Sequence, residues 1–101
     1  MNEVVDRPDE GRFVLEVDGG VDGPVAELFY RVEGNYLVLI HTEVPEALEG
    51  RGLGGTLDRE ALDRAARDGL TVVPLCPFAR GWLQRHPDDA ARAQIDWELG
   101  T

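Results

Sequence analysis

Lysine is absent from this chain of 101 residues, and cysteine and methionine occur once each. The lone cysteine, Cys76, excludes an internal disulfide and leaves no cluster of thiols for a metal, which agrees with a reducing compartment. No apolar run approaches the ~20 residues of a membrane span, and residues 1–6 lack the basic and apolar segments of a signal peptide. We therefore expect a soluble, cytoplasmic protein without zinc or another metal.

Positive charge is also scarce. Ten arginines stand against twenty acidic residues, so the formal net charge is -10. This balance argues against general binding to the phosphates of nucleic acids, and it favours a cationic partner. Solubility and the codon bias of a GC-rich genome account for the same composition. With 43% hydrophobic residues, the chain fits a single domain, residues 1–101, with one core.

Alternating apolar residues in the N-terminal half predict three strands, at residues 12–18, 26–32 and 36–42. Turn-forming residues fill positions 19–24, and Gly34-Asn35 can take the positive φ angles of a tight hairpin. The third strand is apolar without interruption from Leu37 to Ile40. We therefore expect it to be central in the sheet and covered on both sides.

An amphipathic helix is expected after the glycine-rich run at residues 49–56, ending at about Asp68 with Gly69 as its C-terminal cap. Its buried stripe is predicted to consist of Leu57, Ala61, Leu62, Ala65 and Ala66. Its outer side is predicted to consist of Asp58, Arg59, Glu60, Asp63, Arg64 and Arg67, with the ion pairs Glu60–Arg64 and Asp63–Arg67.

A short strand at residues 70–73 follows this helix and is expected to lie parallel to the third strand through a right-handed crossover. Pro74 interrupts the strand. Pro77 suits the first position of a second helix, for which Cys76 would be the N-cap and His86 the C-terminal cap before Pro87.

The remaining apolar residues are assigned to packing. Phe78 and Trp82 have helical spacing, so both are expected in the core. A short helix is expected at residues 90–94, with Trp97 as an anchor for the end of the chain.

The glycine-rich run, Glu49-Gly50-Arg51-Gly52-Leu53-Gly54-Gly55-Thr56, predicts an anion site. Glycines let the backbone approach a ligand, and the free N–H groups and dipole of the next helix favour phosphate or pyrophosphate. Gly50-x-Gly52-x-x-Gly55 also matches the letters of a dinucleotide-binding fingerprint, but residues 70–76 supply no acidic residue for a ribose. A P-loop is excluded because no lysine precedes Thr56.

Four short motifs occur in order around this run: His41-Thr42-Glu43-Val44-Pro45, Gly50-Arg51-Gly52-Leu53-Gly54, Val-Val-Pro-Leu-Cys-Pro-Phe at residues 72–78, and His86-Pro87. Together they resemble the very small members, of about 100 residues, of the GCN5-related N-acetyltransferase superfamily. In that superfamily the pyrophosphate loop follows a central strand and reads Gln/Arg-x-x-Gly-x-Gly/Ala. This chain departs from the pattern at Glu49, and Val38 stands where many larger relatives carry a glutamate base.

The resemblance implies an α/β domain with a truncated acetyltransferase fold. Its small mixed sheet would have antiparallel N-terminal strands and a splayed parallel pair at the cofactor site, with two main helices. It also implies that acetyl-CoA pairs its pantetheine with the first splayed strand and places its pyrophosphate on the loop. Because a carboxylate near pyrophosphate is unfavourable, we expect Glu49 to face solvent. The implied cofactor-binding residues are Thr42, Glu43, Val44, Arg51, Gly52, Leu53, Gly54, Gly55 and Thr56.

Cys76 and His41 are the candidate catalytic residues. A cysteine at a helix N-cap is in a setting that favours the reactive thiolate, although a single cysteine is often a small buried apolar residue. His41 can accept the proton that an amine loses on attack. Because it occupies an apolar strand, we expect it to be buried or part of a site, on the face opposite to Val38, Ile40 and Thr42.

The predicted function is acetyl transfer from acetyl-CoA to an amine on a small molecule, peptide or protein. In the preferred mechanism the amine attacks the thioester directly, His41 or water accepts the proton, and backbone amides near Val44 polarise the carbonyl. An acetyl-enzyme intermediate on Cys76 is the other route. The alternative function is a module that binds or senses CoA without turnover. No nucleic acid or membrane partner is expected, and the protein is expected to be a monomer or a weak homodimer.

Overall fold

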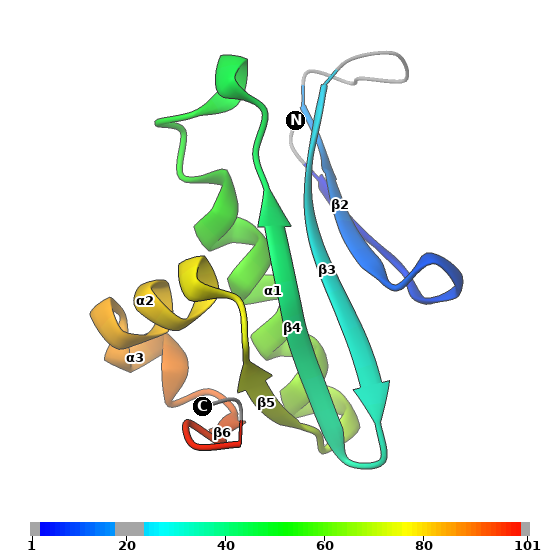
Figure 1. Ribbon diagram of the computed structural model, residues 1–101, viewed down its shortest axis with the longest axis vertical. Helices are drawn as coiled ribbons and strands as arrows, with labels where there is room; N and C mark the ends of the chain where they lie inside the picture. Colours follow the sequence, from blue (N-terminus) through cyan, green and yellow to red (C-terminus); the bar gives the residue numbers. More distant parts are fainter. Residues whose placement is uncertain (1–2, 18–23, 100–101) are drawn as a thin grey trace.

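The computed structural model describes residues 3–17 and 24–99, which form a mixed sheet packed against helices (Figure 1). The strands are β1 (Glu3–Arg7), β2 (Arg12–Glu16), β3 (Val25–Glu33), β4 (Tyr36–Glu43), β5 (Thr71–Pro74) and β6 (Gln94–Ile95). The helices are α1 (Leu53–Asp68), α2 (Pro77–Arg85) and α3 (Pro87–Ala90), with 3-10 turns η1 (Pro8–Glu10) and η2 (Glu46–Leu48). Most of the turn predicted at residues 19–24 lies outside the described residues.

The six strands follow one another across the sheet in chain order. β1 to β4 are antiparallel, whereas β4, β5 and β6 are parallel. The predicted fold class, a mixed sheet with antiparallel strands followed by a parallel pair, is confirmed. The sequence does not predict β1 or β6, because β1 lacks a clean apolar alternation and β6 has only two residues.

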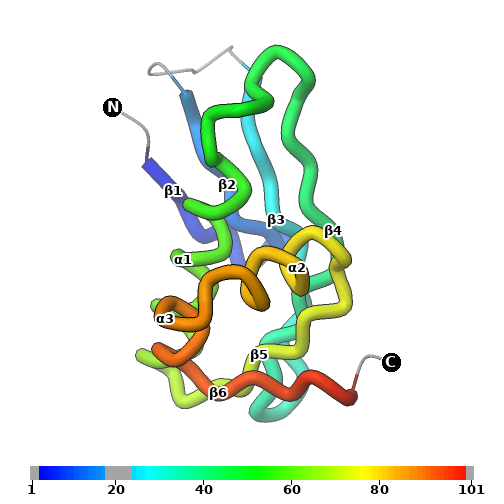
Figure 2. Tube along the Cα trace, turned by 90° about the vertical axis from the view of Figure 1, so that its left-hand side faces the viewer, coloured from blue at the N-terminus to red at the C-terminus, as the bar shows by residue number. Residues whose placement is uncertain are grey.

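Both long helices lie on one face of the sheet. Figures 1 and 2 show α1, α2 and α3 gathered together on one side of β2, β3 and β4. Each parallel strand is added on the same side of the strand before it, so the two crossovers return over the same face. The core between helices and sheet includes Phe13, Leu15, Leu28, Leu37, Leu39, Leu57, Ala61, Leu62, Ala79 and Trp82.

β4 is central, as predicted, but the helices of residues 3–17 and 24–99 cover it on one side only. Leu37 and Leu39 lie beneath the helices, whereas Val38 points to the helix-free face and is shielded there by neighbours such as Val73 on β5. Ile40 is 39% exposed. The expectation of two covered faces is therefore wrong, because side chains of adjacent strands can bury an apolar residue without a second layer of helices.

A β-bulge interrupts the pairing of β3 with β4. The register shifts between Phe29 and Tyr30, which leaves Ile40 as the extra residue on β4. Because side chains alternate between faces along a strand, one extra residue exchanges the faces of everything beyond it. Thr42 therefore points to the helices, and His41 points to the helix-free face.

α1 has the predicted end and C-terminal cap. It ends at Asp68, and Gly69 takes a φ of 67°. The predicted buried stripe is wrong at two positions, because Ala66 is exposed and Asp58 is only 1% exposed. The prediction assigned helix sides by polarity, whereas helix geometry places Asp58 on the same face as Leu62, four residues later.

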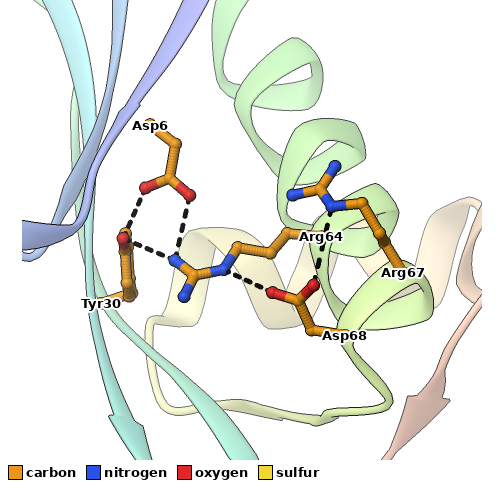
Figure 3. Close-up of polar contacts among 5 residues, drawn as sticks. All are labelled: Asp6, Tyr30, Arg64, Arg67 and Asp68. Carbon is orange, nitrogen blue, oxygen red and sulfur yellow. Dashed lines mark hydrogen bonds and ion pairs between the residues drawn. The ribbon is translucent and has the colours of Figure 1, made fainter.

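Arg64 attaches α1 to the N-terminal strands instead of pairing with Glu60 as predicted (Figure 3). Its Nη1 donates to Asp6 Oδ2 at 3.0 Å and to Tyr30 Oη at 2.6 Å, and its Nε donates to Asp68 Oδ2 at 3.2 Å. Tyr30 Oη donates to the other oxygen of Asp6 at 2.5 Å. Burial, followed by the hydrogen bond to Asp6, raises the pKa of Tyr30 to about 12. This cluster holds α1 against β1 and β3.

The end of the described chain differs from its prediction. The helix expected at residues 90–94 is instead α3, ending at Ala90, followed by β6. Trp97 packs against the core, as expected, with the guanidinium of Arg80 at 5.5 Å from its ring centroid. Asp63 of α1 forms an ion pair with Arg92, which replaces the pair predicted within α1.

No helix in residues 3–17 and 24–99 combines the length and hydropathy that crossing a bilayer requires.

Candidate functional site

The glycine-rich run forms the loop that leads into α1. Gly50 and Gly52 have φ angles of 82° and 72°, a left-handed conformation that a Cβ disfavours. Gly52 is the N-cap, and the first helical hydrogen bond runs from Thr56 N to Gly52 O at 3.2 Å. The N–H groups of Leu53 and Gly54 precede that bond and have no acceptor within the helix. Together with the positive end of the helix dipole, they are groups of the kind that favour an anion.

A pocket of about 360 Å³ lies beside these N–H groups. In Figure 1 the chain rises from the end of β4 to η2 and returns to the start of α1, near the first turn of α2. The pocket lies along this path and is lined by Thr42, Val44, Leu48, Glu49, Gly50, Gly52, Leu53, Gly54 and Phe78. The N–H groups of the first turn of α1 therefore lie at one end of a pocket with largely apolar walls.

α2 packs closely on α1 at the two glycines of positions 54 and 55. A Cβ on Gly54 would lie 2.4 Å from two ring carbons of Phe78, and a Cβ on Gly55 would lie 2.5 Å from Trp82 Nε1. Trp82 is 6% exposed, as predicted for a core residue. Phe78 is 43% exposed and forms a wall of the pocket, so the prediction that it lies in the core is wrong.

β4 and β5 separate on the sheet beside this region. Their last paired residues are Leu39 and Pro74, and the N–H groups of Leu75 and Cys76 both donate to Leu39 O, at 3.0 and 2.9 Å. β4 continues to Glu43, whereas the segment after β5 turns away from β4 and enters α2. No strand in the described residues pairs with the β5 side of β4 beyond Leu39. The backbone groups of that edge are therefore open to a ligand.

Cys76 is the N-cap of α2, as predicted, and is 2% exposed. Its Sγ lies 3.3 Å from Thr42 Oγ1, and Thr42 lines the pocket. The thiol is thus one side chain behind the pocket wall.

His41 is exposed on the helix-free face, which Val38 shares, so the expectations that it is buried and that it faces away from Val38 are wrong. It faces away from Thr42, as predicted, and its other expected setting, part of a site, stays a prediction. Its side chain is 60% exposed, and its ring stacks on Phe29 with the centroids 6.1 Å apart. Its Nε2 lies 3.8 Å from Glu43 Oε1. The bulge at Ile40 is the physical reason. His41 and the pocket therefore lie on opposite sides of the sheet.

The structure brings part of the predicted cofactor-binding set together. Thr42, Val44, Gly52, Leu53 and Gly54 line the pocket, whereas Glu43, Arg51, Gly55 and Thr56 do not. Thr56 Oγ1 donates to Gly52 O at 3.2 Å, and Gly55 lies under Trp82. Glu49, expected to face solvent, is exposed but also lines the pocket. The prediction missed Leu48, whose large apolar side chain in a polar stretch was the available signal.

Asp58 is a second feature that the predicted pattern missed. Both carboxylate oxygens are buried and have no hydrogen-bond partner among the described residues. Burial raises the pKa of Asp58 to about 7, and the positive charge of Arg59 opposes this shift more weakly. The available signal was its position three residues before Ala61 and four before Leu62, within the apolar stripe.

The fold and site define an α/β protein with a glycine loop, which leads into a helix N-terminus, beside an open strand edge. The model of the GCN5-related N-acetyltransferase family matches residues 12–92. The chain belongs to this family, as the sequence motifs predict.

Individual relatives agree with this assignment. The chain is 32% identical over 77 residues to Protein NATD1 of Gallus gallus and of Homo sapiens, which covers 75% of this chain and 68% and 66% of those proteins. The NMR solution structure of a GCN5-like protein from Staphylococcus aureus aligns with a TM-score of 0.69 and 24% identity, covering 96% of this chain and 92% of that one. This structural likeness shows that the fold is shared.

Proposed function

We propose that the protein transfers an acetyl group from acetyl-CoA to an amine. The observation that supports this function is the pocket that joins the free N–H groups of α1 to the open edge of β4. A diphosphate suits the first site, and an amide-containing chain such as pantetheine suits the second. The diphosphate and the pantetheine of CoA thus both have complementary groups within one pocket.

The chain's own residues divide the work of binding. The N–H groups of Leu53 and Gly54 would donate to the diphosphate. Leu48 and Phe78 would cover the pantetheine that extends from the diphosphate. Glu49 at the pocket rim works against an anion, because like charges repel in a partly desolvated site. We therefore expect CoA to bind more tightly to Glu49→Gln than to the parent.

The amine is proposed to approach from the helix-free face, because the bound cosubstrate would fill the other side. His41 lies exposed there, and the carboxylate of Glu43 beside it favours a cationic acceptor. Acetyl-CoA supplies the activated thioester. Backbone N–H groups near Val44 orient and polarise its carbonyl. The amine nitrogen bonds to the carbonyl carbon, the C–S bond breaks, CoA leaves as the thiolate, and the proton passes to His41 or water.

The other route places the acetyl group first on Cys76, with CoA thiolate leaving, and then on the amine. Burial of Sγ behind Thr42 favours direct transfer. Intact mass spectrometry after mixing with acetyl-CoA separates the two routes. We expect no acetyl adduct and full activity in Cys76→Ala. A Cys76 adduct that forms and decays at the rate of turnover would establish the covalent route instead.

Binding of CoA is tested by thermal unfolding of the matched variants Gly52→Ala and Gly69→Ala. Both glycines have positive φ and open space around the missing Cβ, but only Gly52 lines the pocket. At a hundredfold excess over its Kd, CoA stabilises the parent by about 2.7 kcal/mol, which raises Tm by about 10 °C or more. We expect Gly69→Ala to keep this shift and Gly52→Ala to lose most of it. No shift in the parent would refute CoA binding.

A second candidate function is binding of CoA without turnover. It is favoured by Val38, a buried aliphatic residue where larger relatives carry a base. A thermal shift with CoA, but no acetyl transfer to a broad panel of amines and peptides, would support this function over the enzyme.

A further inference from the structure

Asp58 is a buried carboxyl group without a compensating partner. The residue is 1% exposed, and neither oxygen accepts a hydrogen bond from any described residue. An ionised carboxylate in such a place loses its hydration and gains no hydrogen bond in return, which is costly. The structure described here, in which α2 packs on α1, is therefore compatible with the neutral acid; we call it the closed state. Ionisation of Asp58 favours any motion that exposes the carboxylate to water.

The position of Asp58 on α1 identifies which motion that is. It follows Gly54 by four residues and Gly55 by three, so all three lie on the same face of the helix. Phe78 and Trp82 of α2 pack on the two glycines. Movement of α2 away from α1 would thus open the face that carries Asp58.

Charged groups on α1, α2 and α3 do not neutralise Asp58. Among the described residues, Arg59 is the cation that shifts the pKa of Asp58. Its guanidinium lies 5.1 Å from the Trp82 ring centroid and 3.5 Å from Asp89 of α3. His86, at the end of α2, stacks on Trp82 with centroids 4.2 Å apart, and its Nδ1 lies 2.8 Å from Trp82 O. The other arginines of these helices are Arg64, Arg67, Arg80, Arg85 and Arg92 after α3.

The strands packed against α1 offer no partner either. Asp6 of β1 and Tyr30 of β3 are bound to Arg64, six residues further along α1. The buried side chains of β2, β4 and β5 in the core are apolar. The thiol of Cys76, before α2, lies against Thr42.

We propose that Asp58 is a proton-operated latch between α1 and α2. The neutral acid lets α2 remain packed on the glycines of α1, and loss of the proton releases α2 together with Phe78, the wall of the pocket. The latch is a property of the folded chain and operates whether or not the pocket binds CoA.

The direction of the effect follows from proton linkage. The ordinary pKa of an aspartate is 3.8, and burial raises that of Asp58 to about 7, so the closed state holds the proton more tightly than an open one. Opening therefore becomes easier as the pH rises from about 4 to about 7 and changes little above that range. One linked proton increases the opening constant by up to about tenfold per pH unit.

Hydrogen exchange of the α2 amides tests this latch in the protein without ligand. The parent and Asp58→Asn are compared at each pH from 5 to 8, so that the intrinsic dependence of exchange on pH cancels in the ratio. We expect the parent to exchange faster than the variant by a factor that grows up to about a hundredfold from pH 5 to 7 and then levels off. A ratio that does not change with pH would overturn the proposal.

Two controls separate Asp58 from neighbouring groups. Glu60→Gln removes an acid from the outer side of the same helix, and His86→Gln removes the imidazole stacked on Trp82. Both variants should retain the parent's profile. Asp58→Leu serves if the asparagine variant does not fold. If neither folds, the test uses His86→Gln, in which exchange of the α2 amides, corrected for intrinsic rates, should still rise from pH 5 to 7. A profile that is flat over this range would overturn the proposal.

Discussion

Alanine at position 54 and alanine at position 55 should have different effects on stability, although the two changes are adjacent and chemically identical. Each removes a helical glycine, which by itself stabilises α1 by up to about 1 kcal/mol. Each also introduces a Cβ that overlaps an aromatic ring of α2, at 2.4 Å from Phe78 and 2.5 Å from Trp82. The outcome depends on whether the ring can yield.

Phe78 can yield because it is 43% exposed, whereas Trp82 is 6% exposed and has His86 stacked on it. Moving the Phe78 ring costs about 1 kcal/mol at most, so Gly54→Ala should match the parent's stability within about 1 kcal/mol. Overpacking against Trp82 costs about 1–3 kcal/mol, so Gly55→Ala should be destabilised by up to about 2 kcal/mol after the helical gain. For a chain of this size, 1 kcal/mol corresponds to about 4–8 °C in Tm.

Urea unfolding and CoA titration of both variants measure these effects independently. Gly54→Ala should retain stability and lose affinity for CoA, because the displaced ring is a wall of the pocket. Gly55→Ala should be less stable than the parent in urea unfolding. Equal stability of the two variants would refute the argument from ring exposure, and unchanged CoA affinity in Gly54→Ala would remove Phe78 from the proposed binding site.

Three further predictions follow from particular side chains. Asp58→Asn should match the parent's stability near pH 4 and exceed it by up to about 4 kcal/mol above pH 7 in urea unfolding, because the raised pKa of Asp58 makes its contribution decline as the pH rises; a difference independent of pH would contradict this. Tyr30→Phe should lose about 1 kcal/mol in the same assay, since it deletes the hydroxyl between Asp6 and Arg64; an unchanged midpoint would show that Arg64 and Asp6 suffice. His41→Gln should reduce acetyl transfer about a hundredfold with CoA affinity unchanged; full activity would assign the proton to water.

The parts of the fold that depend on neighbours in sequence were predictable. The helix of residues 53–68 and its Gly69 cap follow from apolar spacing and from the one residue type that takes positive φ without strain. The hairpin between β3 and β4 and the N-cap at Cys76 are local in the same sense. The motifs around the glycine loop likewise identify the family, because they record residue types at fixed separations.

The faces and depths of individual side chains were not predictable, because they depend on contacts between distant segments. The bulge at Ile40 exists only in the pairing of β4 with β3, and it alone decides that Thr42 faces Cys76 while His41 faces away. Phe78 lies at the pocket because α2 rests on Gly54.

Asp58 shows most clearly the difference between what the local sequence determines and what tertiary contacts determine. The sequence by itself determines that this chain forms a glycine loop followed by an amphipathic helix, since backbone freedom and apolar spacing are local properties. Only the tertiary structure decides that α2 covers the helix face on which Asp58 lies. The free-energy cost of burying its charge arises only when the two helices pack together. For that reason no local sequence pattern predicts it.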